Sequence, residues 1–389
     1  MFSSRLPAKL EANAVSRAID RRRASGATLL DLTQTNPTLV GISYPAGVLS
    51  SLSNQQAAVY APDPLGLAEA RSAVADEARA TGIPVTASQI VLTASTSEAY
   101  ALLFKLLCNP GDEVLVPQPS YPLFEMLTRL EGIEPAAYRL EHHGAWSIDR
   151  ASLERVMTGR TRAVLTVSPN NPTGSMMRAA DVDWLTGLCA RSDTAIIADE
   201  VFADYPLMPR PDACRLAGDR RALTFSLGGL SKSAGLPQVK LGWIIVSGPD
   251  DLAAAAIERL DVISDTYLSV STPVQVAARR LIESGRTIRT AIRARIGRNL
   301  HSLDDRLRGF PGVALLQPEG GWSAVLRVPR RASEEELVLR LVDEASVIVH
   351  PGYFFDFAAE AFLVVSLLPP PDEFDTAIDR LLPVAAGAR

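Results

Sequence analysis

The chain has 389 residues, of which 47% are hydrophobic and 21% charged, and its net charge at pH 7 is −5. This length accommodates a large domain and a smaller one, and the acidic balance argues against holding nucleic acid by bulk electrostatics. Three cysteines and four histidines lack the spacing of a disulfide framework or metal site, so we expect no metal. The N-terminus is charged and no apolar run is long enough to span a membrane, which predicts a cytoplasmic protein without membrane contact.

Short apolar runs alternate with helical patterns from residue 89 to residue 248. The runs predict strands at residues 89–94, 112–117, 162–168, 194–200, 222–227 and 241–248. They are continuously apolar and β-branched rather than alternating, which is typical of strands buried on both faces. We therefore expect an α/β domain built on a mostly parallel sheet.

The sequence pattern changes near residue 287. A long basic amphipathic helix is expected over 287–310, and short strands within 313–329 and 344–352 surround another helix at 334–345. This pattern predicts a smaller α+β domain. We expect the domains to divide as 46–285 for the large one and 286–389 for the small one, with 1–45 completing the small one.

Polar residues follow several of the expected strands, at the edge where ligands bind in parallel sheets. Residues 95–98 (Ser-Thr-Ser-Glu) open a helix, Asn171 lies in the turn 169–174, Asp199 ends a strand, and Lys232 follows another. Each has a simpler explanation, as a capping box, a turn, a helix cap or a solvated lysine. Together, an anion site, an amide, a carboxylate and an amine suit pyridoxal 5′-phosphate, whose aldehyde forms a Schiff base with lysine.

The order and spacing of Asn171-Pro-Thr-Gly, Asp199-Glu200 and Ser231-Lys232 resemble the class I/II aminotransferase family of fold-type I pyridoxal-phosphate enzymes. The resemblance runs from about residue 31 to the C-terminus. It implies a large domain with a mostly parallel, seven-stranded-type sheet flanked by helices, and a smaller α+β domain. It also implies an aminotransferase acting on an amino acid or related amine, as a homodimer with shared active sites.

The same resemblance assigns roles to individual residues. Lys232 matches the Schiff-base lysine that also shuttles a proton, and Asp199 matches the partner of the pyridine nitrogen. Asn171 matches the donor to the ring 3′-oxygen, and Tyr121 matches the aromatic that stacks on the ring. Other matched positions contact the phosphate: Ser95, Thr96, Ser97 and Tyr60, the last donated by the neighbouring subunit.

Three departures from the family pattern concern the cofactor. Gly229 replaces a serine often found three residues before the lysine, which leaves Ser231 as the expected hydroxyl contact. Lys240 stands eight residues after Lys232, where the family often has an arginine on the phosphate, and a solvated lysine is the alternative reading. Phe202 replaces a tyrosine whose phenol normally donates to the 3′-oxygen. We therefore expect the Lys232 Schiff base to stay protonated to higher pH than in relatives that have the tyrosine, unless Phe202 is a neutral swap that only keeps ring packing.

A fourth departure concerns the substrate. The family's C-terminal arginine, which clamps the substrate carboxylate, is replaced by Val364 in the run Phe-Leu-Val-Val-Ser. Loss of a bidentate carboxylate contact raises the alternative of a lyase, decarboxylase, oxidase or carbon–carbon bond-forming enzyme on the same cofactor. Trp322, Phe354 and Phe355 match regions near the substrate, although core packing explains them equally well. His350 is a candidate polar contact to the substrate, with a structural histidine as the favoured alternative.

Overall fold

The computed structural model describes residues 2–7, 11–219 and 221–387. Its main feature is an eight-stranded sheet in the order β2-β9-β8-β7-β6-β3-β4-β5, in which β8, β7, β6, β3 and β4 run parallel. The strands are β2 (Ile90–Thr93), β3 (Glu113–Gln118), β4 (Glu134–His142), β5 (Trp146–Ile148), β6 (Thr161–Val167), β7 (Ala195–Asp199), β8 (Thr224–Gly229) and β9 (Gly242–Ser247). The predicted α/β fold class is thereby confirmed.

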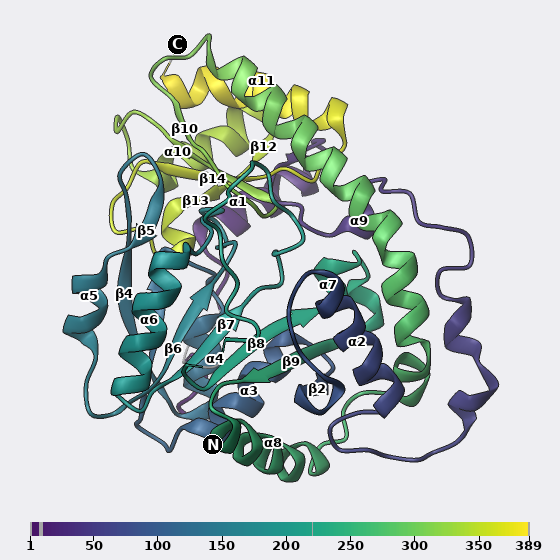
Figure 1. Cartoon of the computed structure of the whole chain (residues 1–389). Coiled ribbons are helices and arrows are strands. Elements are labelled where there is room, and N and C mark those ends of the chain that lie inside the picture. The colour runs from purple at the N-terminus through teal and green to yellow at the C-terminus, as the bar shows by residue number, and fades with distance from the viewer. Residues whose placement is uncertain (1, 8–10, 220, 388–389) are drawn as a thin grey trace.

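Helices cover both faces of the large sheet (Figure 1). They are α2 (Ala68–Ala80), α3 (Thr96–Leu107), α4 (Phe124–Glu131), α5 (Arg150–Val156), α6 (Ala179–Arg191) and α8 (Asp250–Asp265). Along β3, Val114 packs toward the α3 side while its neighbour Leu115 packs toward the α6 side, and both are fully buried. Burial on both faces explains why the strands are continuously apolar.

The expectation of six strands in this region missed β4 and β5. β4 lies near the edge of the sheet, and several of its side chains remain exposed or half-buried. Its sequence, EPAAYRLEH, is therefore mixed rather than continuously apolar. β5 has only three residues and pairs antiparallel to β4, which raises the sheet from the seven-stranded type to eight strands.

The small domain is built on a four-stranded antiparallel sheet in the order β10-β11-β14-β13. Its strands are β10 (Ala314–Leu316), β11 (Ser323–Arg327), β13 (His350–Pro351) and β14 (Phe362–Ser366). In the N-terminal segment, β1 (Leu30–Asp31) pairs with β12 (Val347–Ile348), and the assignment of residues 1–45 to the small domain remains a prediction. The helices are α1 (Ala14–Ala24), α10 (Glu334–Arg340) and α11 (Pro371–Ala386).

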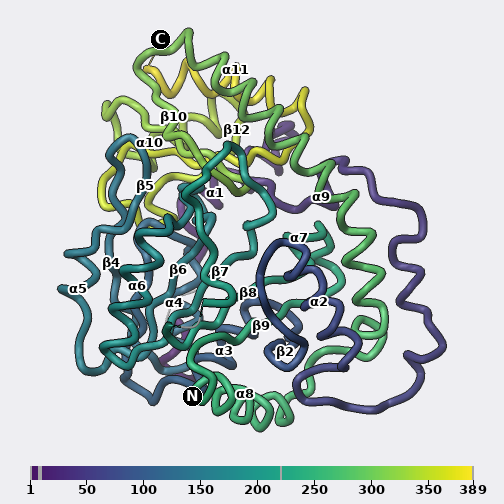
Figure 2. Tube along the Cα trace, viewed as in Figure 1, coloured from purple at the N-terminus to yellow at the C-terminus, as the bar shows by residue number. Residues whose placement is uncertain are grey.

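One long helix, α9 (Thr272–Leu307), runs from the large sheet to the small domain, as Figures 1 and 2 show. The division expected near residue 285 falls inside this helix and remains a prediction. Gly285 packs against α7 (Leu230–Ser233) and its C-cap Ala234, and an added Cβ would lie 2.3 Å from the Ala234 Cβ. Glycine therefore lets α9 support the turn that carries Lys232. No helix among the described residues is long and apolar enough to cross a membrane.

Candidate active site

The carboxyl ends of the parallel strands bring the predicted site residues to one edge of the large sheet. Asn171 follows β6, Asp199 is the last residue of β7, and Lys232 lies in α7, directly after β8. Tyr121 follows β3, and Ser95 lies between β2 and α3. The alternation of strand and helix thus gathers residues that are far apart in sequence.

Lys232 is partly buried, and its amine lies among aromatic rings. Its Nζ is 4.7 Å from the ring centre of Trp322 and 5.4 Å from that of Phe202. Burial lowers the pKa of Lys232 to about 8, although the nearby Asp199 carboxylate opposes the shift. The phenol of Tyr205 donates to the Lys232 carbonyl oxygen and so fixes the backbone. The amine can therefore become a neutral nucleophile close to physiological pH.

Asp199 is 8% exposed and is held by two hydrogen bonds. The Tyr100 phenol donates to Oδ2 at 2.7 Å, and the Val201 amide donates to Oδ1 at 3.2 Å. Burial raises the pKa of Asp199 above its usual value, and both hydrogen bonds oppose this rise. Burial and the Asp199 charge raise the pKa of Tyr100, so its phenol remains a donor.

Tyr100 was missed by the sequence analysis. It lies one turn into α3, on the buried face of an apolar helix. A tyrosine there has the sequence pattern of an ordinary core residue. Only the fold brings it to Asp199, 99 residues away, so no local signal would have identified it.

Tyr121 and Asn171 lie in two turns, after β3 and after β6, that are joined by the side chain of Asn170. Asn170 is buried, donates from Nδ2 to Ser120 Oγ at 3.3 Å, and accepts from Thr173 through Oδ1. This amide holds the turn after β6 against the turn after β3, while Asn171 stays half-buried. Tyr121 is 40% exposed, and burial together with the Asp199 charge raises its pKa, which indicates that the phenol lies near that carboxylate.

The residues expected at the phosphate have mixed surroundings. Ser95 caps α3, because its Oγ accepts from the Glu98 amide at 3.1 Å, so the capping explanation holds and the hydroxyl is engaged. Thr96 is half-buried and Ser97 is exposed in the first turn of α3, where the helix dipole favours an anion. Lys240 is exposed, with φ +58°. Its contact with the phosphate therefore remains a prediction.

Ser231 and Tyr60, two other residues expected to bind the cofactor, lie in different hollows of the structure. Ser231 is half-buried and lines the cavity that contains Lys232. Tyr60 is 76% exposed and lines a separate surface hollow with Tyr267. The structure therefore does not bring Tyr60 to Lys232 of its own chain, which is what a residue donated to a neighbouring subunit requires.

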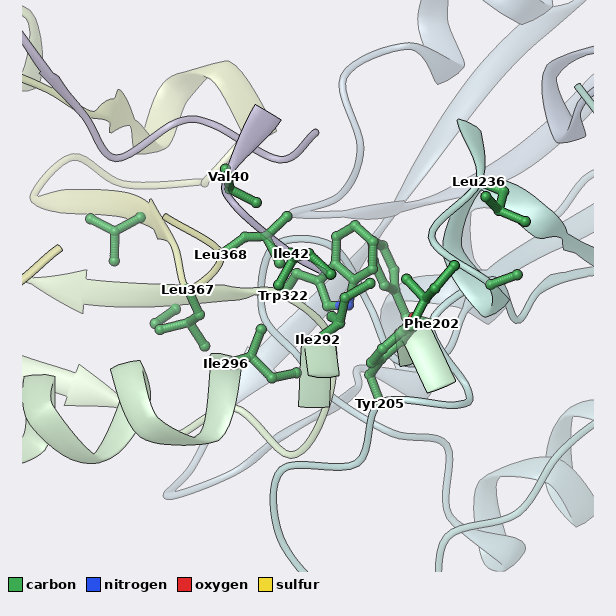
Figure 3. Packing of buried hydrophobic residues seen from close by; sticks show 14 of the residues in the cluster. Val40, Ile42, Phe202, Tyr205, Leu236, Ile292, Ile296, Trp322, Leu367 and Leu368 are labelled. Carbon is green, nitrogen blue, oxygen red and sulfur yellow. The ribbon is translucent and has the colours of Figure 1, made fainter. Parts of the chain in front are cut away.

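An aromatic cluster joins the site to the small domain (Figure 3). Trp322 is 2% exposed, and its ring centre lies 5.4 Å from that of Phe202 and 5.1 Å from that of Tyr205, both edge-on. Ile42 from the N-terminal segment and Ile292 from α9 belong to the same cluster. Trp322 is therefore a core residue and also the wall behind the Lys232 amine.

The substrate side is apolar where the family has its arginine. Val364 is 2% exposed in β14, opposite Val325 and His350, and packs in one cluster with Trp146 and Phe355. Burial lowers the pKa of His350, although the Asp31 charge opposes the shift. His350 is therefore neutral at pH 7 and does not replace the missing cation.

These residues fit pyridoxal 5′-phosphate by their chemistry. Lys232, whose amine has a lowered pKa, lines a cavity of about 370 Å³, large enough for a small ligand. A buried carboxylate, an aromatic ring and a helix N-terminus lie at the same edge, where a pyridine nitrogen, a ring face and a phosphate each need such a partner.

Comparison with known proteins agrees with this assignment. Residues 32–381 match the family described as aminotransferase class I and II. The alanine aminotransferase of Mycobacterium tuberculosis is 29% identical over 375 residues, covering 93% of this chain and 86% of that protein. The glutamate-pyruvate aminotransferase of Haemophilus influenzae is 26% identical, covering 93% and 91% of the two chains.

Solved structures share the fold. The alanine aminotransferase of Pyrococcus furiosus superposes with a TM-score of 0.87 at 24% identity, covering 98% of both chains. A Thermus thermophilus aspartate aminotransferase double mutant gives 0.86 at 24% identity, covering 99% of both. Members of the matched family use pyridoxal 5′-phosphate. This chain belongs to the aminotransferase class I and II family and is a transferase that uses this cofactor.

Proposed function

We propose that this aminotransferase takes the amino group from an amino acid or related amine through a Schiff base on Lys232. The observation that carries the proposal is Lys232, which lines a cavity and whose amine has a pKa lowered to about 8 in the field of Asp199. When bound, the cofactor supplies an aldehyde that accepts the amino group and a ring that withdraws electrons.

The surrounding residues take distinct parts in this proposal. Lys232 moves the proton between the substrate carbon and the cofactor, acting as base and then as acid. Asp199 keeps a proton on the pyridine nitrogen, and Tyr100 keeps Asp199 ionised by donating to Oδ2. Asn171 and Tyr121 orient the ring. Ser95, Thr96, Ser97, Ser231, Lys240 and, from a second subunit, Tyr60 hold the phosphate and its surroundings.

A second outcome on the same cofactor is favoured by one specific feature. Val364 leaves the substrate side without the arginine that orients an α-carboxylate in the family. A lyase, decarboxylase, oxidase or carbon–carbon bond-forming reaction does not depend on that clamp in the same way. These reactions need Lys232 and Asp199 as much as aminotransfer does.

The two outcomes differ in what happens to the bound cofactor. In aminotransfer, an amino donor converts it to the pyridoxamine form and releases one equivalent of a carbonyl product. Absorbance of the bound cofactor and mass spectrometry of the products measure both. A product that forms while the cofactor keeps its pyridoxal form would refute aminotransfer in favour of the second outcome.

We further propose a cytoplasmic homodimer with shared active sites. Tyr60 supports this because its side chain is 76% exposed and lies away from Lys232 of its own chain. In a dimer that exposure ends when Tyr60 enters the neighbouring site. Sedimentation equilibrium is expected to give twice the 41.7 kDa mass of the chain, and a monomer mass would contradict the proposal.

Capture of the cofactor by cofactor-free protein is expected to depend on pH with a midpoint near 8. Burial disfavours the charged amine and lowers the pKa of Lys232 to about 8, from the 10.5 of an ordinary lysine. The amine is therefore neutral and reactive at a lower pH. Stopped-flow absorbance from pH 6 to 10 measures the rate, with free Nα-acetyl-lysine as the control. A rate that still climbs steeply above pH 9 would contradict the lowered pKa.

The substitution Phe202→Tyr is expected to lower the pH at which the Lys232-bound cofactor loses its proton. The ring centre of Phe202 lies 5.4 Å from the Lys232 Nζ. A phenol at this position is expected to donate to the 3′-oxygen and stabilise its negative charge. A pH titration of the cofactor absorbance measures the midpoint. Phe202→Leu, which adds no donor, is the control, and equal midpoints in the tyrosine variant and the native protein would refute the effect.

A further inference from the structure

The cavity at Lys232 has a wall that is polar but poor in positive charge. Its described lining contains two ionisable side chains, Asp31 and Lys232. The remaining polar lining includes Thr33, Gln34 and Thr35, which are uncharged. When the Lys232 amine is neutral, as proton transfer requires, Asp31 leaves this wall with a net charge of −1.

Asp31 is held in place by the small domain and its own loop. It pairs with Ile348 across β1 and β12, and its Oδ1 accepts from the Thr33 amide at 2.8 Å and the Thr33 hydroxyl at 2.5 Å. Among the described residues, both hydrogen bonds to this carboxylate end on Oδ1. The other oxygen, Oδ2, can therefore accept from a ligand in the cavity.

His350, the histidine on which the Asp31 charge acts, does not compensate for this negative charge. Val364 stands opposite His350 in the β13–β14 pair, and His350 is neutral at pH 7 because burial lowers its pKa. The rings of Phe354 and Phe355 lie 5.8 and 5.7 Å from the His350 ring. A carboxylate in the cavity would meet the Asp31 charge, whereas an ammonium group would find a carboxylate partner.

Resting on the proposed aminotransfer at Lys232, we propose that the amino donor is a primary amine of a particular class. It lacks a carboxylate on the carbon that bears the reacting amine, and it carries a second ammonium group that Asp31 binds. The carbon of the donor loses its amino group and two electrons and becomes an aldehyde. The cofactor's aldehyde carbon gains both, and the water formed in one condensation is consumed in the next, so the exchange balances.

Four amines separate the two features of this class. Ornithine and 1,4-diaminobutane differ only in the α-carboxylate, and norvaline and butylamine differ in the same way without the distal ammonium group. Lysine and 1,5-diaminopentane repeat the first comparison with a longer chain. The holoenzyme is mixed with each amine, and the rate of conversion of the bound cofactor to the pyridoxamine form is measured.

The diamines are expected to react about tenfold or more faster than the corresponding amino acids and than butylamine. Asp31→Asn is expected to lower the ratio of diamine to butylamine rates about tenfold, because it removes the charge and keeps the shape. Asp251→Asn, which removes an exposed carboxylate of α8, is the matched control and keeps the native ratio. Val364→Arg is expected to shift the preference toward ornithine and norvaline.

A second measurement does not depend on turnover or on the folding of the Asp31 variant. The Lys232→Ala protein, loaded with cofactor, cannot complete the exchange, and calorimetry then gives the Kd of each diamine and amino acid. Tighter binding of the diamines supports the inference. Tighter binding or faster reaction of the amino acids, or an unchanged ratio in a folded Asp31→Asn variant, overturns it.

Failure of the inference and failure of the proposed function have different signatures. Conversion of the cofactor by alanine, glutamate or tyrosine, with no response to the diamines, overturns the amine class and keeps aminotransfer. If neither the diamines nor these amino acids convert the cofactor, both proposals fail. Absorbance of the Lys232-bound cofactor before mixing verifies that each variant is loaded.

Discussion

Replacing Lys232 with alanine is expected to lower the rate of aminotransfer by about 10³-fold or more, which is the range seen when a positioned acid–base group is lost. Under the proposed function the variant also lacks the amine that would bind the cofactor covalently. Its loaded form should therefore not show the absorbance of a lysine-bound cofactor. Steady-state kinetics and absorbance spectra measure both effects.

Lys240→Ala provides the matched control for this substitution. Lys240 is exposed and eight residues further along the chain, so its loss should weaken cofactor binding without removing the covalent link. The expected spectrum is that of the native protein at sufficient cofactor concentration. A Lys232→Ala protein that kept the native spectrum, or a Lys240→Ala protein that lost it, would show that the reactive lysine has been misassigned.

The substitution Asp199→Asn is expected to lower kcat on the order of 10²-fold or more, because a buried carboxylate that stabilises the developing charge is lost. Asp199 is 8% exposed, so solvent cannot replace its charge. An amide does not hold a proton on the pyridine nitrogen as a carboxylate does. Rapid-mixing kinetics of the cofactor conversion, rather than overall turnover, isolates the affected step.

Tyr100→Phe should give a smaller effect of the same kind, on the order of tenfold for a shift of one pKa unit. Removing the 2.7 Å hydrogen bond raises the pKa of Asp199 further, so the proton moves from the ring nitrogen toward the carboxylate. Infrared titration of the carboxyl group in cofactor-free protein measures that pKa independently of activity. An unchanged pKa would mean that Tyr100 has only a packing role.

The sequence predicted the framework of the fold because burial on both faces of the central strands leaves a direct trace in composition. Val114 and Leu115 illustrate this trace, since neighbouring side chains pack against opposite helical layers. The strand β4, next to the edge of the sheet, left no such trace, because it is only partly buried. The helix expected from residue 287 begins at Thr272, after a short loop that follows α8. Gly285 therefore lies inside the helix rather than at a boundary.

The candidate site was predictable to the extent that its chemistry lies in short motifs at strand ends. Lys232, Asp199 and Asn171 belong to such motifs, and the fold places all three at one edge of the sheet. Tyr100 and Asp31 were not predictable in this way. Their positions depend on tertiary contacts, with Asp199 across the sheet and with Ile348 in the small domain, that no local pattern encodes.

The continuous helix α9 has a mechanical consequence. At about 1.5 Å of rise per residue, its 36 residues form a stiff rod about 54 Å long. In one part of the helix Gly285 packs against Ala234. Another part packs against the small domain, where Asp31 pairs with Ile348. A rotation of the small domain that moved α9 would therefore also move the contact between Gly285 and Ala234, next to the turn that carries Lys232.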